Sequence, residues 1–444
     1  VMNDKGNIHT ESGADPIGME IRAQAFAFAS NDEINNMTFY NYELINRGTQ
    51  TLFNTYFGNF TDGALGDPFD DFVGCDVNRG LAYYYNGDNF DDDNNGFYGY
   101  KDNPPAVGVD FFEGPFQDDD GIDNAFGIGP GEALNGIGYG DGIIDNERYG
   151  MRRFTYYSNL TNGALPSQTD PINAPDYYNY LQGKWKDGSY FYYGGSGHGS
   201  DPAANTSVKC DFMFPGDTDP LGWGTNGVPQ PEWTEQTAGN VPNDRRFVQS
   251  AGPFILKPGA VNNITVGVVW ARAVSIDPFQ SVVALRRADD KAQALFENCF
   301  KVLDAPHAPI MQAQELENEV ILSLSNPLNS NNYNENYTEF DPFIVATDPG
   351  ADKFYKFQGY QIYQLKSNDI SFSDVEDATK ARLVAQCDIK DGISRIINFE
   401  YDADIGASTP TLKVEGADAG IQHTFQVTED QFAQGNRTLV NFKR

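Results

Sequence analysis

The chain has 444 residues, and its 63 acidic side chains outnumber 30 basic ones to give a formal charge of −33 at pH 7. Such a charge repels nucleic-acid phosphates and anionic membrane surfaces, so neither is an expected partner. Hydrophobic residues make up 40% of the chain and aromatic residues 14%, enough for packed cores. The chain contains no run of about 18 apolar residues, so no membrane-spanning helix is predicted.

The first elements have the alternation typical of β-strands. Residues Ile17–Phe28 place Ile, Met and Ala side chains on one face and aromatic side chains on the other, as expected for a sandwich with both faces covered. Met37–Asn46 and Thr51–Phe57 repeat this β-forming composition on either side of a turn at Arg47–Thr49. These segments predict an antiparallel, β-sandwich-like domain.

From Asp62 to Arg153 the chain is dominated by Gly, Asp and Asn with scattered aromatic residues. A surface loop of this length is unusual unless something orders it. We therefore expect an acidic loop insertion at about residues 62–153 that folds around bound ions.

A hairpin and a helix are predicted at the end of this domain. Ala251–Ala273 contains two apolar runs joined by a Lys-Pro-Gly turn at residues 257–259. Asp277 is a suitable N-cap and Pro278 a suitable first helical residue. The apolar residues that follow recur at intervals of three and four, which predicts a helix lying on a sheet or closing one end of the sandwich. They are Val282, Leu285, Ala288, Ala292, Leu295, Phe296 and Cys299.

Two prolines within Leu303–Pro309 predict an extended linker at residues 304–309. The linker separates a first domain, residues 1–303, from a second β domain, residues 310–444. Three strands are expected in the second domain. They are Val320–Leu324, Phe357–Leu365 and Ala381–Ile389.

The second domain resembles a fibronectin type III module, a β-sandwich. The likeness rests on the Pro-rich entry, on EVILSLSNP (Glu319–Pro327) and on the tyrosine-bearing GYQIYQL (Gly359–Leu365), with Leu324 where such modules often have Trp. RTLVNFKR (Arg437–Arg444) looks like the segment before the penultimate strand of such a module. The resemblance implies a truncated module that lacks its last two strands.

A wider resemblance covers most of the chain. The segments NDEINNMTFYNYELINRGTQTL, DDFVGCDVNRGLAYYYNGD, DRRFVQSAGPFILKPG and SVVALRRADDKAQALFENCF look like segments of large, mostly uncharacterised surface proteins of Bacteroidota that are associated with type IX secretion. The resemblance implies a secreted protein, extracellular or at the cell surface. Because Val1 follows no initiating Met or leader, we expect a mature or fragmentary piece of a longer chain.

The stretch Asn89–Asp102 (NFDDDNNGFYGYKD) matches the spacing of a calcium loop. Such a loop needs oxygen ligands at positions one, three, five, seven and twelve and Gly at six. Asp91, Asp93, Asn95, the carbonyl of Phe97 and Asp102 occupy the ligand positions, with Gly96 at the turn. No amphipathic helix flanks the loop, so a structural calcium site is expected rather than a sensor.

Two further segments, Asp118–Asn124 and Gly140–Glu147, resemble the calcium-wrapping loops of thrombospondin-like repeats. Both place a Gly turn beside one acid and return another acid three or four residues later. The alternative is that these runs are solvated turns. The candidate ligands are Asp118, Asp120, Asp123, Asp141, Asp145 and Glu147. A further acidic group matches no known spacing. Its members are Asp62, Asp67, Asp70, Asp71 and Asp76.

Catalytic signals are sparse. His198 lies in GGSGHGSD near Ser and Asp residues, but a glycine-rich surface loop explains that pattern better than a catalytic triad. Tyr192 and Trp223 are candidate sugar-binding aromatics, with burial in a core as the alternative. We therefore expect a non-enzymatic, calcium-stabilised structural or adhesive protein whose partners are other extracellular segments or copies of itself, with glycans as a second class. The alternative is a carbohydrate-binding module, or a hydrolase of extracellular polysaccharide or peptide.

Overall fold

The computed structural model describes residues 2–3, 10, 12–28, 33–159, 164–297, 300, 304–340, 352–368, 370, 374–402 and 407–439. The protein is mainly β, as expected. Its chain divides into two compact units, Val1–Cys299 (unit 1) and Phe300–Arg444 (unit 2). Among the described residues, no helix combines the length and apolar character needed to cross a membrane.

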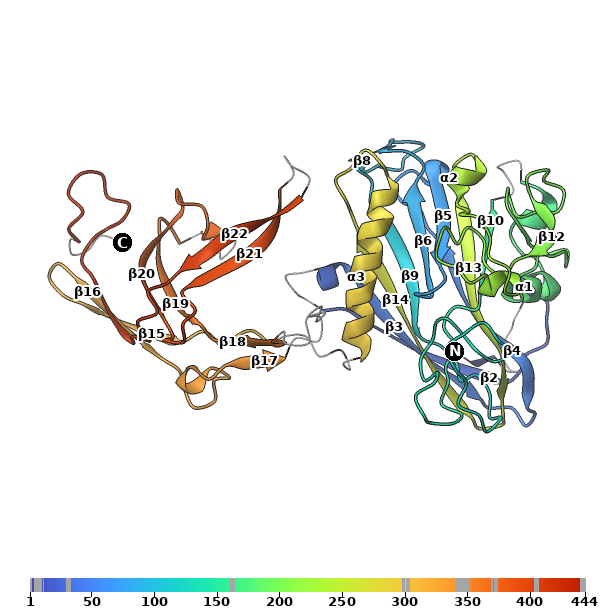
Figure 1. Ribbon diagram of the computed structural model, residues 1–444, viewed down its shortest axis with the longest axis horizontal. Helices are drawn as coiled ribbons and strands as arrows, with labels where there is room; N and C mark the ends of the chain where they lie inside the picture. The colour runs from blue at the N-terminus through green and yellow to red at the C-terminus, as the bar shows by residue number, and fades with distance from the viewer. Residues whose placement is uncertain are drawn as a thin grey trace. The chain divides into compact units, whose positions relative to one another are not determined.

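Unit 1 is built around a seven-stranded antiparallel sheet, with β14 and β9 near its centre (Figure 1). In spatial order its strands are β1 (Met2–Asn3), β2 (Met19–Phe26), β3 (Thr38–Asn46), β14 (Val261–Ala271), β9 (Ala106–Glu113), β6 (Leu81–Asn86) and β5 (Asp71–Asp76). Strands that are far apart in sequence are therefore neighbours, since β14 pairs with both β3 and β9.

A second, three-stranded sheet packs on one face of the large sheet. Its strands are β10 (Arg153–Ser158), β13 (Arg245–Leu256) and β4 (Leu52–Asp62). Aromatic side chains from both sheets meet in the core, where the rings of Tyr84 and Phe247 are 4.9 Å apart and those of Phe57 and Phe111 are 5.7 Å apart. This packing confirms the predicted β-sandwich-like architecture.

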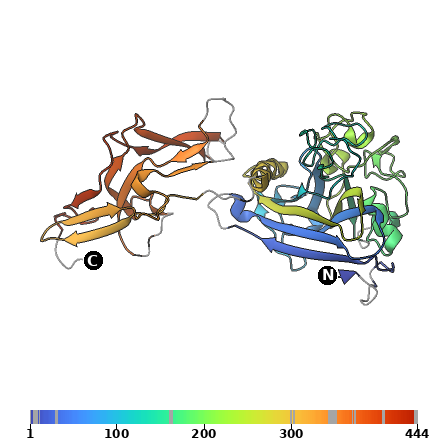
Figure 2. The same ribbon diagram turned by 90° about the horizontal axis from the view of Figure 1, so that it is seen from below.

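Helix α3 (Phe279–Glu297) covers the opposite face of the large sheet (Figures 1 and 2). The carboxylate of Asp277 accepts the Phe279 N–H at 3.0 Å, which confirms the predicted N-cap. Tyr83 and Tyr85 contact Phe279 on this face, whereas Tyr84 points into the sandwich. All three tyrosines are thus buried because β6 is covered on both sides. Of the residues predicted for the helix, Cys299 lies outside the described part of the chain.

The prediction of an acidic insertion over residues 62–153 is wrong for its first half. This half contains β5, β6 and β9, which are integral strands of the large sheet, and a short hairpin of β7 (Phe90–Asp91) and β8 (Lys101–Asp102). Strands buried on both faces lack the polar alternation by which a half-exposed strand is recognised. Residues 114–152, here called the acidic loop, contain isolated bridges but no helix or strand.

The remaining elements of unit 1 are short, and they lie partly beside the smaller sheet and partly beside the large sheet and α3. They are α1 (Ala174–Leu181), β11 (Tyr192–Tyr193), β12 (Asn205–Lys209), α2 (Glu235–Ala238) and the 3-10 turns η1 (Glu33–Asn36), η2 (Pro68–Asp70), η4 (Pro166–Gln168) and η5 (Trp223–Thr225). The side chain of Asn173 caps helix α1 by accepting the Asp176 N–H.

In its described residues, unit 2 contains one three-stranded sheet and three two-stranded antiparallel sheets. Its strands are β15 (Ile310–Glu315), β16 (Val320–Ser325), β17 (Thr338–Phe340), β18 (Phe354–Lys356), β19 (Gly359–Leu365), β20 (Ala381–Asp388), β21 (Arg395–Asp402), β22 (Ala407–Glu415) and β23 (Thr424–Val427), with a 3-10 turn η6 (Tyr333–Glu335). The three predicted strands correspond to β16, β19 and β20. A small core holds the unit together, formed by Leu324, Tyr337, Phe357, Tyr360, Cys387 and Phe425.

The cysteines within the described residues, Cys75, Cys210 and Cys387, are buried free thiols. Burial raises the pKa of the Cys75 and Cys210 thiols well above its usual value, so both stay protonated at neutral pH.

Candidate metal centre

Within the acidic loop, carboxylates hold distant turns together through backbone N–H groups. Asp123 accepts the N–H of Gly140 at 2.8 Å through one oxygen and that of Gly142 at 2.7 Å through the other. Glu147, which is only 2% exposed, accepts the Asn124 N–H. The two segments that the sequence singles out, Asp118–Asn124 and Gly140–Glu147, therefore fold against each other.

This folding brings three of the predicted ligands to one place. Asp118, Asp120 and Asp145 each offer a carboxylate oxygen, and the three oxygens lie within 4.8 Å of one another. Asp145 has a left-handed backbone with φ of 57° and accepts the Gly121 N–H at 2.7 Å, which fixes it beside the first turn. The described structure contains no other group of three His, Cys, Asp or Glu side chains that converge in this way.

The triad has no basic counterion among the described residues, since none of the three carboxylates forms an ion pair. The basic side chain of Lys257 pairs with Asp119 instead, at 2.6 Å. Partial burial, followed by the charge of Asp120, raises the pKa of Asp118 above its usual value. A divalent cation bound at the triad would reduce the repulsion between Asp118 and Asp120, which is the second cause of the raised pKa.

The other three acids predicted in this region serve the loop's own structure. Both oxygens of Asp123 accept backbone N–H groups, and Asp141 accepts the Ile143 N–H at 2.8 Å and the Asn146 side-chain amide at 2.9 Å. Glu147 is placed near enough to contribute to the raised pKa of Asp118. Asp123 and Asp141 thus position the triad. The triad acids also accept hydrogen bonds, Asp145 from the Gly121 N–H at 2.7 Å, Asp120 from the Ile122 N–H at 2.9 Å and Asp118 from the Gln117 amide at 3.5 Å, but each of these bonds uses one carboxylate oxygen and leaves the other for an ion.

The structure does not bring together the ligands predicted in Asp91–Asp102. These residues form a hairpin whose turn is Asn95-Gly96, with positive φ at both positions, and the Phe97 carbonyl accepts the Asn94 N–H at 3.1 Å. Asp93 pairs with Lys101 at 2.6 Å.

Asp91 is fully buried within this hairpin, and its two oxygens accept the N–H groups of Asp67 and Tyr100. Asp102 lies exposed in β8. The spacing that matches a calcium loop therefore corresponds to an Asn-Gly hairpin, because the same Asn-Gly pair that suits a calcium loop also suits a tight hairpin turn.

Neither predicted sugar-binding aromatic forms an open platform. Trp223 is 5% exposed, with its ring 5.6 Å from that of Phe212 and the Arg152 guanidinium over it at 4.4 Å. Tyr192 is half-buried in the short β11–β12 hairpin. For Trp223 the alternative of burial in a core is correct.

The structure offers no complete catalytic triad at His198. Its ring nitrogens lie 3.2 Å from the Ser167 hydroxyl and 2.7 Å from the Ser200 hydroxyl, so a hydroxyl stands where a triad requires a carboxylate. Asp201 instead accepts the backbone N–H groups of Ser196 and Ala203. This geometry favours a glycine-rich loop whose polar side chains form hydrogen bonds within the loop.

A buried acid pair, Asp110 on β9 and Asp289 on α3, was missed by the sequence interpretation. The two are 1% and 2% exposed, and burial raises both pKa values. Repulsion from Asp76 adds to the rise for Asp110, and repulsion from Asp110 adds to the rise for Asp289. They line a cavity of about 230 Å³, smaller than the pockets that usually hold organic ligands. Asp289 sits on the apolar stripe of α3 between Leu285 and Ala292, and that misplaced charge is the signal in the sequence.

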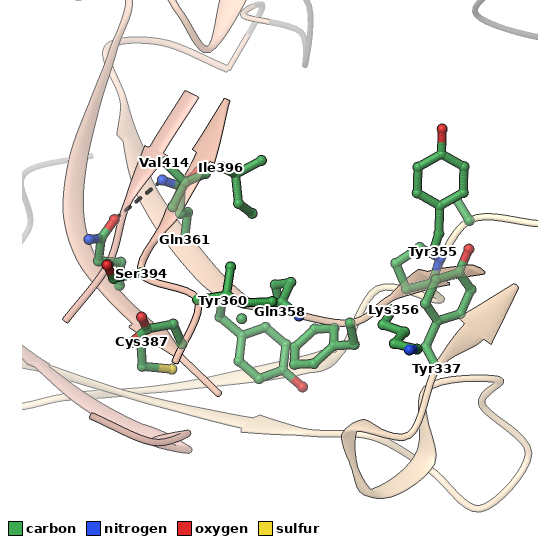
Figure 3. Close-up of a pocket in the computed structure, with 18 residues that line it drawn as sticks. Tyr337, Tyr355, Lys356, Gln358, Tyr360, Gln361, Cys387, Ser394, Ile396 and Val414 are labelled. Atoms are coloured by element: carbon green, nitrogen blue, oxygen red, sulfur yellow. Dashed lines mark hydrogen bonds between the residues drawn. The ribbon is translucent and has the colours of Figure 1, made fainter. Parts of the chain in front are cut away.

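Unit 2 contains a larger pocket of about 500 Å³. Figure 3 shows Tyr337 and Tyr355 on one side of it and Ile396 and Val414 on the other, with Tyr360 between them. Amide side chains, including those of Gln358 and Gln386, also line it. The pocket therefore combines aromatic surface with amide groups and with two charged side chains, Lys356 and Asp388.

Comparison with known proteins gives no match: no family model fits the chain, and neither a curated protein nor a solved structure is similar to it.

Proposed function

We propose that this is a secreted structural or adhesive protein of the bacterial cell surface, in which calcium bound by Asp118, Asp120 and Asp145 stabilises unit 1. The convergence of these three carboxylates within 4.8 Å, without a basic partner among the described residues, carries the proposal. An enzymatic role finds less support, because the buried acid pair borders a cavity too small for a sugar polymer or a peptide.

Electrostatics supports a cation in the acidic loop. Two unit charges about 4 Å apart repel by about 1 kcal/mol in water and by about 4 kcal/mol at an effective dielectric constant near 20. Calcium prefers carboxylate, carbonyl and water oxygens and takes about six to eight of them. The triad supplies three such oxygens, and calcium would need the rest from backbone carbonyls and water.

The cell-surface part of the proposal rests on composition and on resemblance. A charge of −33 keeps an extracellular protein soluble, and bound cations would neutralise part of it. The likeness to type IX-associated surface proteins of Bacteroidota supports secretion. In unit 2 the antiparallel order β15-β16-β23 is compatible with one sheet of a fibronectin type III-like module. Such modules suit contacts with other extracellular segments or with copies of the same chain.

The proposal is tested by calcium titration and limited proteolysis of the full chain. Wild-type protein should take up calcium, and chelation should expose the acidic loop, residues 114–152, to protease. Asp145→Asn should abolish the calcium protection, since it removes one of three converging ligands. Asp119→Asn is the matched control, because this acid lies in the same loop but pairs with Lys257. Calorimetry without calcium uptake at millimolar metal would refute the proposal.

Glycan binding is the second candidate function, and the pocket in unit 2 favours it. Its aromatic walls suit the apolar face of a sugar ring, and its glutamine amides suit hydroxyl groups. Tyr355 is 51% exposed and is the natural residue to test. A glycan array should give hits that Tyr355→Ala removes and that Leu328→Ala, an exposed residue outside the pocket, retains. An array without hits would dismiss this candidate.

A further inference from the structure

A second set of oxygen ligands lies at the open end of the β5–β6 hairpin, outside the acidic loop. Asp71 begins β5 and Asn86 ends β6, and the two are directly opposite in the antiparallel register. Residues directly opposite in such a pair have their side chains on the same face, about 5 Å apart at Cβ. Asp70 precedes Asp71, and its carbonyl accepts the Gly87 N–H at 2.7 Å, so it also lies beside the end of β6.

The side chains at this point carry buried oxygens without hydrogen-bond donors. Asp71 and Asn86 are both fully buried. One oxygen of Asp71 accepts the Leu65 N–H at 3.1 Å, but its Oδ1 has no partner. The Asn86 amide nitrogen donates to the Asp88 carbonyl at 3.1 Å, which fixes the amide and leaves its Oδ1 unpartnered. Asp70 Oδ1 and Asn89 Oδ1 are likewise buried without a hydrogen bond of good geometry, although the Asn86 amide lies near enough to Asp70 to offset part of the rise in its pKa.

The charges around these oxygens have one sign. Burial, followed by repulsion from Asp91, Asp67 and Asp88, raises the pKa of Asp70 to about 7. Burial also raises the pKa of Asp71 well above its usual value. None of these five acids forms an ion pair with a basic side chain in the described part of the chain. Unpaired buried charge is costly, so the site requires either protons or a cation.

A hard cation satisfies this arrangement better than protons do. One proton neutralises one carboxylate and provides a single hydrogen-bond donor. Four buried oxygens at this site lack a hydrogen-bond partner, so one proton cannot satisfy them all. Two carboxylates and two amide oxygens, with no nitrogen or sulfur donor, are the ligand chemistry of calcium. Magnesium usually retains several waters, which the full burial of Asp71 and Asn86 disfavours.

We propose that Asp70, Asp71 and Asn86, with Asn89 as a further oxygen donor, bind a second calcium ion in unit 1. The ion would join the η2 turn to the β5–β6 hairpin and so fix β5, the outermost strand of the large sheet in this direction. This site shares no residue with the acidic-loop triad, so each can be present without the other.

Calorimetric titration of the full chain with calcium counts the ions directly. Asp71→Asn should lower the number bound by one relative to wild type, and Asp145→Asn should independently lower it by one, which separates this inference from the proposed function. Asp92→Asn, which replaces an exposed acid of the neighbouring hairpin, should leave the number of bound calcium ions unchanged. If Asp71→Asn does not fold, Asp70→Asn gives the same readout, because Asp70 is only partly buried.

Thermal unfolding gives an independent readout. In chelator, Asp71→Asn should melt at or above the wild-type temperature because it removes a buried charge, and calcium should raise its Tm less than it raises that of wild type. An unchanged ion count in both Asp71→Asn and Asp70→Asn would overturn the inference and leave protons or water as the partners of these oxygens.

Discussion

Replacing Arg245 by Met is expected to destabilise unit 1 by about 3–5 kcal/mol, because it leaves a buried carboxylate without its counterion. The partner is Glu235, whose side chain is 0% exposed, while that of Arg245 is 9% exposed. Arg245 reaches both Glu235 oxygens, at 2.9 to 3.2 Å. Glu235 also accepts the Val73 N–H of β5 at 3.0 Å, so the pair links the two sheets of the sandwich.

The assay is equilibrium urea unfolding, followed by circular dichroism. Lys257→Ala is the control: it breaks the Lys257–Asp119 pair, whose side chains are 65% and 69% exposed, and should leave the free energy of unfolding nearly unchanged. Combining Glu235→Gln with Arg245→Met should recover much of the loss, since Gln keeps an acceptor for Val73 without a buried charge. If Arg245→Met costs no more than Lys257→Ala, the buried pair does not link the sheets as argued.

Three further outcomes are expected. The pKa of Asp289 in the folded state is raised above the usual 3.8, so the stability of the wild-type protein should fall as the pH rises above that value. Asp289→Asn removes this charge and should therefore raise the Tm more at pH 8 than at pH 5, measured with a chelator present. Trp223→Ala should cost about 3–5 kcal/mol in urea unfolding without selectively removing glycan binding, because the ring is buried; loss of glycan binding at unchanged stability would contradict this. Leu285→Ala should cost about 2–5 kcal/mol, whereas Ile276→Ala, at a 93% exposed site, should stay within about 0.5 kcal/mol.

Local signals in the sequence predicted several elements correctly. Helix α3 begins where Asp277 and Pro278 indicate, and the apolar stripe that includes Leu285 and Ala292 faces the sheet. The strands at Thr38–Asn46 and Val261–Ala271 also lie where β-forming residues and turns indicate. Such features depend on interactions between residues close in sequence, and these interactions do not depend on the tertiary structure.

The same local reasoning failed where one local pattern fits two structures. Asn95-Gly96 suits a calcium loop and a hairpin turn equally, and the pairing of Phe90 with Asp102 decided for the hairpin. The consecutive tyrosines of β6 show no alternation of polar and apolar side chains, because one face of the strand packs against α3 and the other against the second sheet.

For the candidate sites, the sequence by itself determined which residues carry oxygen ligands, and tertiary structure decided which of them meet. Asp118 and Asp120 converge with Asp145 because backbone N–H groups of each turn bind carboxylates of the other. Asp71 meets Asn86 only through strand register. The spacing of residues along the chain cannot encode such contacts, since closing a loop between distant segments depends on the packing and hydrogen bonds of the whole unit.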